Sequence, residues 1–288
     1  MGYESVFAPG LFAGQVVIVT GGGSGIGRCT AHELAHLGAH VVITGRTLEK
    51  LETVAAEIAS DGGAATPIAC DIRDEGQVGA MVDRVLAERG AIHGLVNNAG
   101  GQYRAEMKTL STKGFEAVVR NNLTGGFIVM REVYNRWMEA NGGAIVNIIA
   151  DIWHGWPEFA HSGAARGGMH TLSETAACEW AHSGVRVNSL APGGIASSGF
   201  DTYPPELQAR LLEYPAQVPM QRYGTESEIA AGIVFLLSPA AAFITGTCLR
   251  IDGGAPNRRQ TWTGRYPATN VKEFNGFHRG VKPKVLGG

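Results

Sequence analysis

The segment VVIVTGGGSGIG, residues 16–27, decides the fold of this chain. Its first five residues are apolar or β-branched and form a strand candidate, and a glycine-rich turn follows directly. An apolar-periodic helix candidate comes next, at 28–37. Glycines in such a turn let backbone N–H groups approach a pyrophosphate at a helix N-terminus. The turn does not match GxGxxG, so the nucleotide-binding prediction depends on the flanking strand and helix.

The same alternation of strand and helix continues along the chain. Seven strands separated by helices predict repeated βαβ units. The expected fold is therefore α/β, a Rossmann-type, doubly wound, seven-stranded parallel sheet with helices on both faces. Residues 1–254 are interpreted as one dinucleotide-binding and catalytic domain, and 255–288 as a C-terminal extension. Further strands are expected at 41–44, 66–70, 94–97, 144–149, 185–190 and 248–251, and further helices at 48–59, 75–88, 114–138, 162–181, 206–213 and 229–237.

Composition excludes several classes of function. The chain has 288 residues, of which 44% are hydrophobic and 17% charged, and its net charge is −2, which gives no reason to expect a nucleic-acid partner. Apolar runs are too short to span a membrane, and VLGG at the C-terminus is not a peroxisomal address. Four scattered cysteines without a CxxC pair predict reduced thiols, a cytoplasmic location and no metal site; they are Cys29, Cys70, Cys178 and Cys248.

The end of the second predicted strand indicates which cofactor is used. NAD-binding units place an acidic residue here to hold the ribose 2′-hydroxyl. This chain has Gly45 and Arg46 instead. A guanidinium suits a 2′-phosphate, so the sequence predicts NADP(H), with a solvated surface arginine as the alternative.

Six motifs together resemble the short-chain dehydrogenase/reductase family over residues 13–254: TGGGSGIG (20–27), CDI (70–72), NNAG (97–100), NNLTG (121–125), VRVNSLAPG (185–193) and IDGG (251–254). The resemblance implies a homodimer or homotetramer that associates through the helices around 122 and 162–181. It also implies cofactor contacts at the glycine turn (Gly21, Ser24, Gly25, Ile26, Gly27), at the adenine (Asp71, Ile72), at the ribose and pyrophosphate (Asn98, Ala99, Gly100) and at the nicotinamide (Pro192, Gly193, Ile195, Ser197).

The catalytic positions depart from that family's pattern. The family uses a serine and a Tyr-x-x-x-Lys helix, where lysine lowers the tyrosine pKa and tyrosine protonates a carbonyl oxygen. Ala150, Ser162 and Arg166 occupy the corresponding positions, and Asn122 alone is retained. Ser162 and Arg166 still share one helix face. Their pairing suits holding the nicotinamide ribose and a weakly basic oxygen.

This replacement favours one reaction over another. Hydride addition to a ketone makes an alkoxide, which needs an acid, and Ser162 is a poor one. Hydride addition to an α,β-unsaturated thioester makes a delocalised enolate, for which hydrogen-bond donors can suffice. The residues therefore favour NADPH-dependent reduction of the C2=C3 double bond of an enoyl-CoA.

The segment HSGAARGGM (161–169) is similar to the peroxisomal trans-2-enoyl-CoA reductase branch. In the related mitochondrial dienoyl-CoA reductases, a tyrosine in the loop after strand five donates the proton. This loop has no tyrosine, so His161, Tyr103 and His170 are the candidates, with Asp151 able to orient a donor. His161 is expected to face the cofactor cleft from the start of its helix, and the alternative is a satisfied structural histidine.

Two other functions remain open. The first is an NAD(P)-dependent alcohol or carbonyl dehydrogenase for an apolar substrate, such as a terpenoid of the citronellol type. The second is an NADP-binding protein without catalysis, because three catalytic side chains are replaced. Trp153, Trp156 and Phe159 are expected to line an apolar substrate pocket, although loop packing explains them nearly as well.

Overall fold

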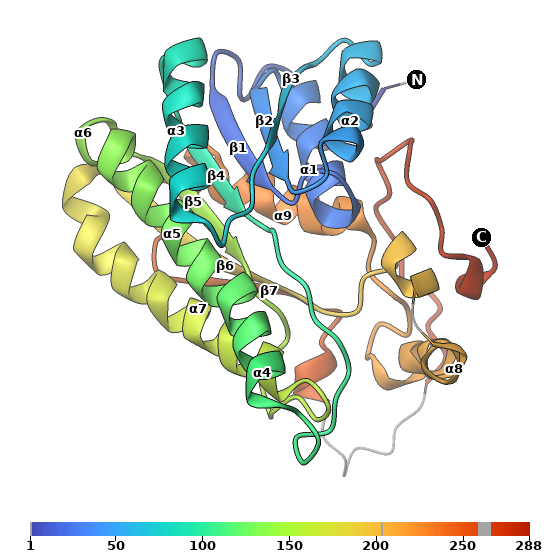
Figure 1. The fold of residues 1–288 in the computed structure, drawn as a ribbon. Helices are drawn as coiled ribbons and strands as arrows, with labels where there is room; N and C mark the ends of the chain where they lie inside the picture. Colours follow the sequence, from blue (N-terminus) through green and yellow to red (C-terminus); the bar gives the residue numbers. More distant parts are fainter. Residues whose placement is uncertain (1, 203, 259–265) are drawn as a thin grey trace.

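The computed structural model describes residues 2–202, 204–258 and 266–288, and one seven-stranded sheet forms its centre (Figure 1). The strand order is β3-β2-β1-β4-β5-β6-β7, and neighbouring strands pair in parallel. The predicted fold class is confirmed. The strands are β1 (Val16–Thr20), β2 (His40–Gly45), β3 (Ala64–Ala69), β4 (Gly94–Asn97), β5 (Gly143–Ile148), β6 (Val185–Pro192) and β7 (Cys248–Ile251).

Helices cover both faces of this sheet (Figure 1). On one face lie α1 (Gly25–His36), α2 (Leu48–Ser60) and α9 (Glu226–Leu237). On the other lie α3 (Glu75–Arg89), α5 (Gly125–Val133) and α7 (Ala160–Trp180), with α4 (Thr112–Val119) and α6 (Glu139–Asn141) at the two ends of α5. The short α8 (Pro205–Glu213) stands apart, beyond the carboxyl ends of the strands.

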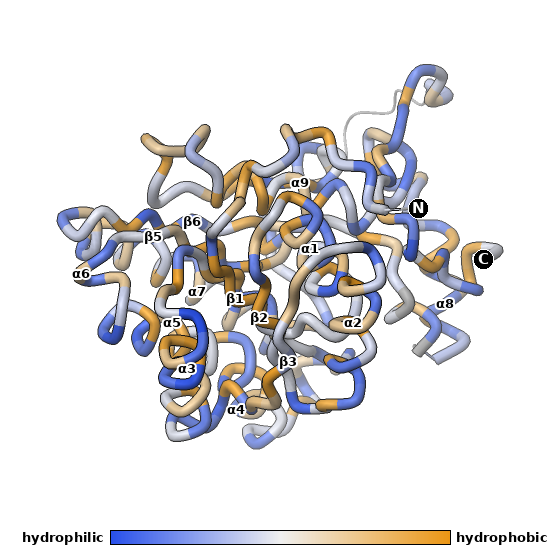
Figure 2. Tube along the Cα trace, turned by 90° about the horizontal axis from the view of Figure 1, so that it is seen from above, coloured by the Kyte–Doolittle hydropathy of each residue, from blue (hydrophilic) through white to orange (hydrophobic). Residues whose placement is uncertain are grey.

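The side chains of β1 explain why it is central. All five residues are buried, as expected for a parallel strand covered on both faces. Because side chains alternate along a strand, Val17 and Val19 join the core under α1, α2 and α9, whereas Ile18 joins the core under α3, α5 and α7. Figure 2 shows β1 and β2 as a largely hydrophobic centre.

The helix expected at 114–138 is longer than predicted and is not regular. Helical backbone runs from Thr112 to Asn141, and two π-helical turns interrupt it, Arg120–Thr124 and Tyr134–Met138. Within the first turn, Asn122 Nδ2 donates to the carbonyl oxygen of Val118 at 3.0 Å. An asparagine side chain that competes for this carbonyl favours a local departure from α-helical bonding.

The segment after the last strand packs on the core of its own chain where the structure describes it. Phe277 is buried against Tyr3 and Cys29, and Arg279 pairs with Asp61 at 2.7 Å. The backbone N–H of Glu4 donates to the carbonyl of Gly276 at 2.9 Å, so the C-terminal segment contacts the N-terminal one. Among the described helices, none has the length and apolar character needed to cross a bilayer.

Candidate active site

The carboxyl ends of β1 and β4 mark the point where the strand order reverses, which is where open α/β sheets bind ligands. Thr20 ends β1, and its Oγ1 accepts hydrogen bonds from the backbone N–H groups of Asn98 and Ala99, each at 2.9 Å. Asn98 Nδ2 returns a bond to the carbonyl of Thr20 at 2.9 Å. The segment after β4 is thereby fixed beside the glycine turn.

Some glycines of the turn pack against the neighbouring backbone. A Cβ on Gly27 would lie 2.3 Å from the carbonyl oxygen of Gly21, so only glycine permits this approach of helix to strand. Ser24 is the exposed N-cap of α1, and its side chain makes no capping bond. A pyrophosphate fits this turn, because the helix N-terminus and the Ser24 hydroxyl both offer donors.

The ends of β2 and β3 carry the residues expected near the adenosine. Arg46 is exposed directly after β2, with no ion pair to any described residue. Asp71 follows β3 and binds Arg73 in a bidentate pair, and this hydrogen bonding lowers the pKa of the Asp71 carboxyl to about 2. Ile72 is buried near Gly125, so its side chain belongs to the core.

A cleft of about 680 Å³ opens at this edge of the sheet. Residues from the loops after β4, β5 and β6 line it, together with the first turn of α1 and residues of α8. The structure thus brings together eight of the predicted site residues: Ile26, Asn98, Gly100, Arg166, Pro192, Gly193, Ile195 and Ser197.

Three predicted residues meet where β4 ends. A Cβ on Gly100 would lie 2.4 Å from Arg166 Nη2 and 2.5 Å from Asn122 Oδ1, so the glycine lets both polar groups reach this backbone. The Asn122 amide donates to the carbonyl of Gly101 at 2.6 Å and accepts from its N–H at 3.0 Å. Asn122 therefore holds the segment after β4 against the long helix.

Arg166 is the one cation among the described residues that line the cleft. Its Nη1 donates to the carbonyl of Ile148 at 2.7 Å, and no described carboxylate lies within ion-pair distance. Burial lowers the pKa of this guanidinium to about 10, so it stays charged at neutral pH. A partly buried cation that faces a cleft and has no described anionic partner can stabilise a developing oxyanion.

Ser162 does not line the cleft. Its side chain is fully buried, and Oγ donates to Gln102 Oε1 at 2.6 Å. Gln102 does line the cleft and was not predicted. The residue in the position of the usual acid therefore acts on the cleft through a neighbouring amide.

The proton-donor candidates lie away from the cleft. His161 has no exposed surface, contrary to the expectation that it faces the cleft; its Nδ1 accepts from the Ser162 N–H at 2.8 Å, and its Nε2 has no described partner. Tyr103 packs edge-on against the His161 ring, with centroids 4.7 Å apart. His170 lies 3.9 Å from Glu174 on the same helix. None of the three is among the described lining residues.

The remaining walls of the cleft are largely apolar. Trp156 and Phe159 line it as predicted, whereas Trp153 packs under the Arg250 guanidinium, 5.1 Å from its ring centroid. Five apolar or aromatic residues that were not predicted complete the walls: Phe200, Leu207, Leu211, Tyr214 and Tyr223. Leu207 and Leu211 are four residues apart on α8, a spacing that could have identified them.

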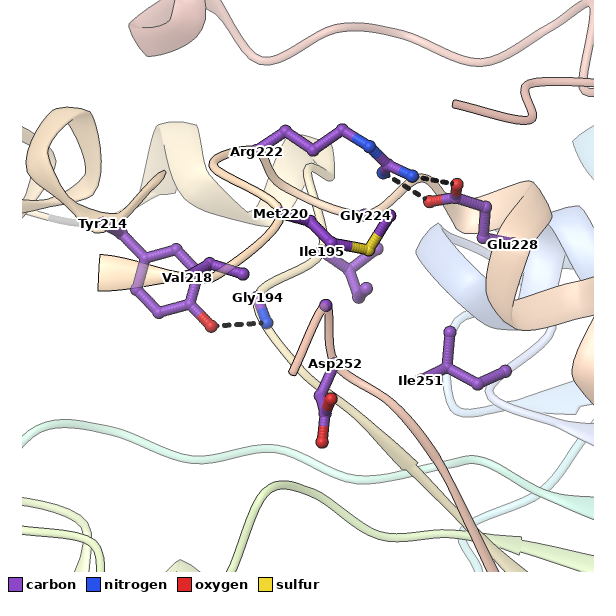
Figure 3. A pocket seen from close by; sticks show the side chains of 11 residues that line it. Gly194, Ile195, Tyr214, Val218, Met220, Arg222, Gly224, Glu228, Ile251 and Asp252 are labelled. Atoms are coloured by element: carbon purple, nitrogen blue, oxygen red, sulfur yellow. Dashed lines mark hydrogen bonds and ion pairs between the residues drawn. The ribbon is translucent and has the colours of Figure 1, made fainter. Parts of the chain in front are cut away.

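A smaller cavity, about 200 Å³, adjoins the cleft across Gly194, Ile195 and Tyr214 (Figure 3). Figure 3 shows the Tyr214 hydroxyl pointing at the backbone nitrogen of Gly194, which donates to it at 3.0 Å. The cavity also contains Asp252, whose Oδ1 accepts from the N–H of Gly254 at 2.7 Å.

Glu158 connects two segments that border the cleft. It pairs with Arg104, after β4, and with Arg210 of α8 at 3.5 Å. Glu158 has a φ of 68° and its carbonyl accepts from the N–H of Ala105 at 2.9 Å. The loop after β5 is therefore bound on one side to the β4 loop and on the other to α8.

Comparison with known proteins identifies relatives over most of the chain. A family model described as enoyl-(acyl carrier protein) reductase matches residues 21–256. The peroxisomal 2,4-dienoyl-CoA reductase of Danio rerio is 36% identical over 262 residues, which cover 88% of this chain and 85% of that protein.

Two solved structures show the same architecture. The citronellol catabolism dehydrogenase of Pseudomonas aeruginosa PAO1 is 57% identical, with a TM-score of 0.80, covering 88% of this chain and 100% of that one. The second structure is a Beutenbergia cavernae protein described as an NAD(P)-dependent gluconate 5-dehydrogenase, with NADP bound at low occupancy. It is 34% identical, with a TM-score of 0.81, and the match covers 87% of this chain and 100% of that one.

Proposed function

Because the chain belongs to the short-chain dehydrogenase/reductase family of nicotinamide-dependent oxidoreductases, we propose that it uses NADPH to reduce the C2=C3 double bond of an enoyl-CoA. The observation that carries this proposal is Arg166, a cation without an anionic partner in a cleft that lacks the family's tyrosine and lysine. Similarity to a 2,4-dienoyl-CoA reductase, whose name describes reduction of a conjugated acyl-CoA to an enoyl-CoA, supports a conjugated thioester as the substrate class.

The cofactor site fits a dinucleotide with a 2′-phosphate. The N-terminus of α1 and the exposed Ser24 would hold the pyrophosphate, and the exposed Arg46 would hold the 2′-phosphate. Pro192, Gly193, Ile195 and Ser197 line the cleft where the nicotinamide would sit. When bound, the reduced nicotinamide supplies hydride. Excluding water from that ring is the task of the apolar walls around Trp156 and Phe159.

Arg166 would act on the substrate oxygen. Addition of hydride to the β-carbon places negative charge on the thioester oxygen, and a fixed guanidinium stabilises that charge more than the neutral ground state. An enolate needs no strong acid at oxygen, so the replacement of tyrosine by Ser162 is compatible with turnover. Reduction of a ketone would instead produce an alkoxide, which needs a proton. The Ser162 hydroxyl already donates its proton in a hydrogen bond to Gln102, so it is poorly placed to supply one.

The test is steady-state oxidation of NADPH with a series of trans-2-enoyl-CoA thioesters of increasing chain length. We expect turnover with NADPH in preference to NADH and identification of the saturated thioester by mass spectrometry. No saturated product at any chain length would refute the proposal.

A second candidate is oxidation of an apolar terpenoid alcohol with NADP or NAD. It is favoured by the 57% identity to the Pseudomonas aeruginosa protein named for citronellol catabolism and by the apolar walls of the cleft. Alcohol oxidation needs a base at the hydroxyl, which neither Ser162 nor Arg166 provides. Formation of aldehyde from citronellol and NADP, without activity on enoyl thioesters, would establish this candidate instead.

We further propose that the protein is a homo-oligomer that associates through the helical layer of α4, α5 and α7. Phe115 and Phe127 are exposed on α4 and α5, at 38% each, and both are large apolar side chains. Sedimentation equilibrium should give a dimer or tetramer, and a charged residue at position 127 should shift it toward the monomer. A wild-type monomer would contradict this proposal.

A further inference from the structure

The proposed reduction needs one proton besides the hydride, because the enolate must become a saturated thioester. The three histidine and tyrosine candidates do not line the cleft among the described residues. Four ionisable side chains do: Asp151, Arg166, Tyr214 and Tyr223. The Tyr223 hydroxyl donates to the carbonyl of Leu211 at 2.7 Å, and the Tyr214 hydroxyl accepts from the N–H of Gly194.

Asp151 is the one carboxyl group among these lining residues. It lies just after β5, and its Oδ1 is buried without a hydrogen-bond partner in the described chain. Buried carboxylate oxygens ordinarily have partners, so an orphaned one on a residue that lines the cleft calls for a functional explanation.

The surroundings of Asp151 raise the pKa of its carboxyl above the ordinary value. Burial raises the pKa of its carboxyl, and the nearby Asp252 raises it further, whereas the Trp153 backbone N–H, Arg250 and His154 lower it, leaving it above its ordinary value. Arg250 is already engaged, because its Nε lies 3.4 Å from Asp252 and its guanidinium covers Trp153. Tyr214 faces the same two aspartates, and burial raises its pKa, which makes it a weaker acid.

From this arrangement we infer that Asp151 is the acid that protonates the α-carbon of the substrate, an inference that rests on the proposed reduction. Hydride forms the new C–H bond at the β-carbon, and the π electrons of the double bond move to give the enolate. The O–H bond of Asp151 then breaks, its proton forms the C–H bond at the α-carbon, and the enolate returns to the thioester. The nicotinamide is oxidised, the double bond is reduced, and water reprotonates Asp151.

Arg166 and Asp151 together replace the two functions of the family's tyrosine, which this chain lacks. Arg166 stabilises negative charge at oxygen, and Asp151 delivers a proton at carbon. No ion pair joins these two described residues, so Arg166 does not hold Asp151 as a paired carboxylate.

The experiment compares wild type with Asp151→Asn on an enoyl-CoA in ordinary and heavy water. We expect kcat to fall at least about 100-fold, with NADPH affinity and thermal stability retained. Wild type should place deuterium on one face of the α-carbon, and the residual product of the variant should carry it on both faces. Asp83→Asn, which removes an exposed carboxylate paired with Arg136, is the matched control and should behave as wild type.

Two failures are distinguishable. If wild type reduces no enoyl-CoA, the proposed function is wrong and this inference falls with it. If wild type is active and Asp151→Asn keeps its rate and its labelling on one face, only the inference is wrong. Should the variant not fold, the wild-type pH profile decides, because reduction must slow as Asp151 loses its proton at rising pH, and a flat profile would overturn the inference.

Discussion

The Ser162 hydroxyl donates a 2.6 Å hydrogen bond to the side-chain oxygen of Gln102, so the residue in the usual acid position holds an amide that faces the cleft. Ser162 is fully buried, which separates it from any substrate.

Replacing Ser162 by alanine should therefore have a small effect. We expect a fall in kcat of less than about tenfold, because only the orientation of Gln102 is lost, at a cost near that of one hydrogen bond. Gln102→Ala should mainly raise KM. Steady-state kinetics with an enoyl-CoA check both variants. A fall of about 100-fold or more for Ser162→Ala would mean that the serine itself supplies a proton.

Replacing Arg166 by methionine should be far more damaging. The variant keeps the packing of the long side chain but removes the charge, so kcat/KM should fall by about 100- to 1000-fold. Arg166→Lys should recover part of this loss, because charge returns without the planar fork. Arg84→Met, an exposed position paired with Glu88, is the control. Equal activity of the Arg166 and Arg84 variants would exclude an electrostatic role for Arg166.

Arg46 should determine the cofactor preference. Arg46→Ala should raise the Kd for NADPH by about tenfold or more and leave that for NADH nearly unchanged, because only NADPH has the 2′-phosphate. Fluorescence titration of both cofactors gives the ratio directly. A parallel loss for the two cofactors would show that Arg46 does not recognise the phosphate.

Glu33 should make stability depend on pH. Burial raises the pKa of its carboxyl to about 7, although hydrogen bonds from Ser5 and Tyr3 lower it. A folded-state pKa above the unfolded value means that stability is highest at acidic pH and falls as pH rises through about 7, by on the order of 3 kcal/mol at full ionisation. Urea unfolding between about pH 5 and pH 8 measures this slope.

The matched variant is Glu33→Gln, which should reduce the slope. A remainder is expected from Glu226, whose pKa burial also raises to about 7. The exposed Glu88→Gln should leave the slope unchanged. A wild-type slope that survives in the Glu33→Gln, Glu226→Gln double variant would locate the pH dependence elsewhere.

Local sequence patterns were sufficient for the fold. Few folds begin with a buried five-residue strand followed by glycines and a helix. The alternation of strands and helices that comes after it predicts a parallel sheet. Thr225 and Glu228, three residues apart in the sequence, form the two reciprocal bonds of a capping box at the start of α9, at 2.9 and 3.1 Å. These features depend on neighbours in the sequence, which is why they could be predicted.

The predictions that failed at the candidate site concern the direction in which side chains point. His161 turns inward because its Nδ1 accepts the Ser162 N–H, one of the donors that the first turn of a helix leaves unpaired. Gln102 is held at the cleft by a hydrogen bond from Ser162, sixty positions away in the sequence. A pattern of neighbouring residues cannot predict such a contact. The π-helical turn at Arg120–Thr124 likewise depends on Asn122 bonding to Gly101 as well as to Val118.

The ion pairs of Glu158 have a consequence for assays. They join α8, which carries part of the apolar wall, to the β4 loop by partly exposed charges, and dissolved salt screens such charges over about 8–10 Å. The apparent KM should therefore vary with buffer ionic strength even for an uncharged substrate. Kinetic constants for this enzyme are comparable only when they are measured at one salt concentration.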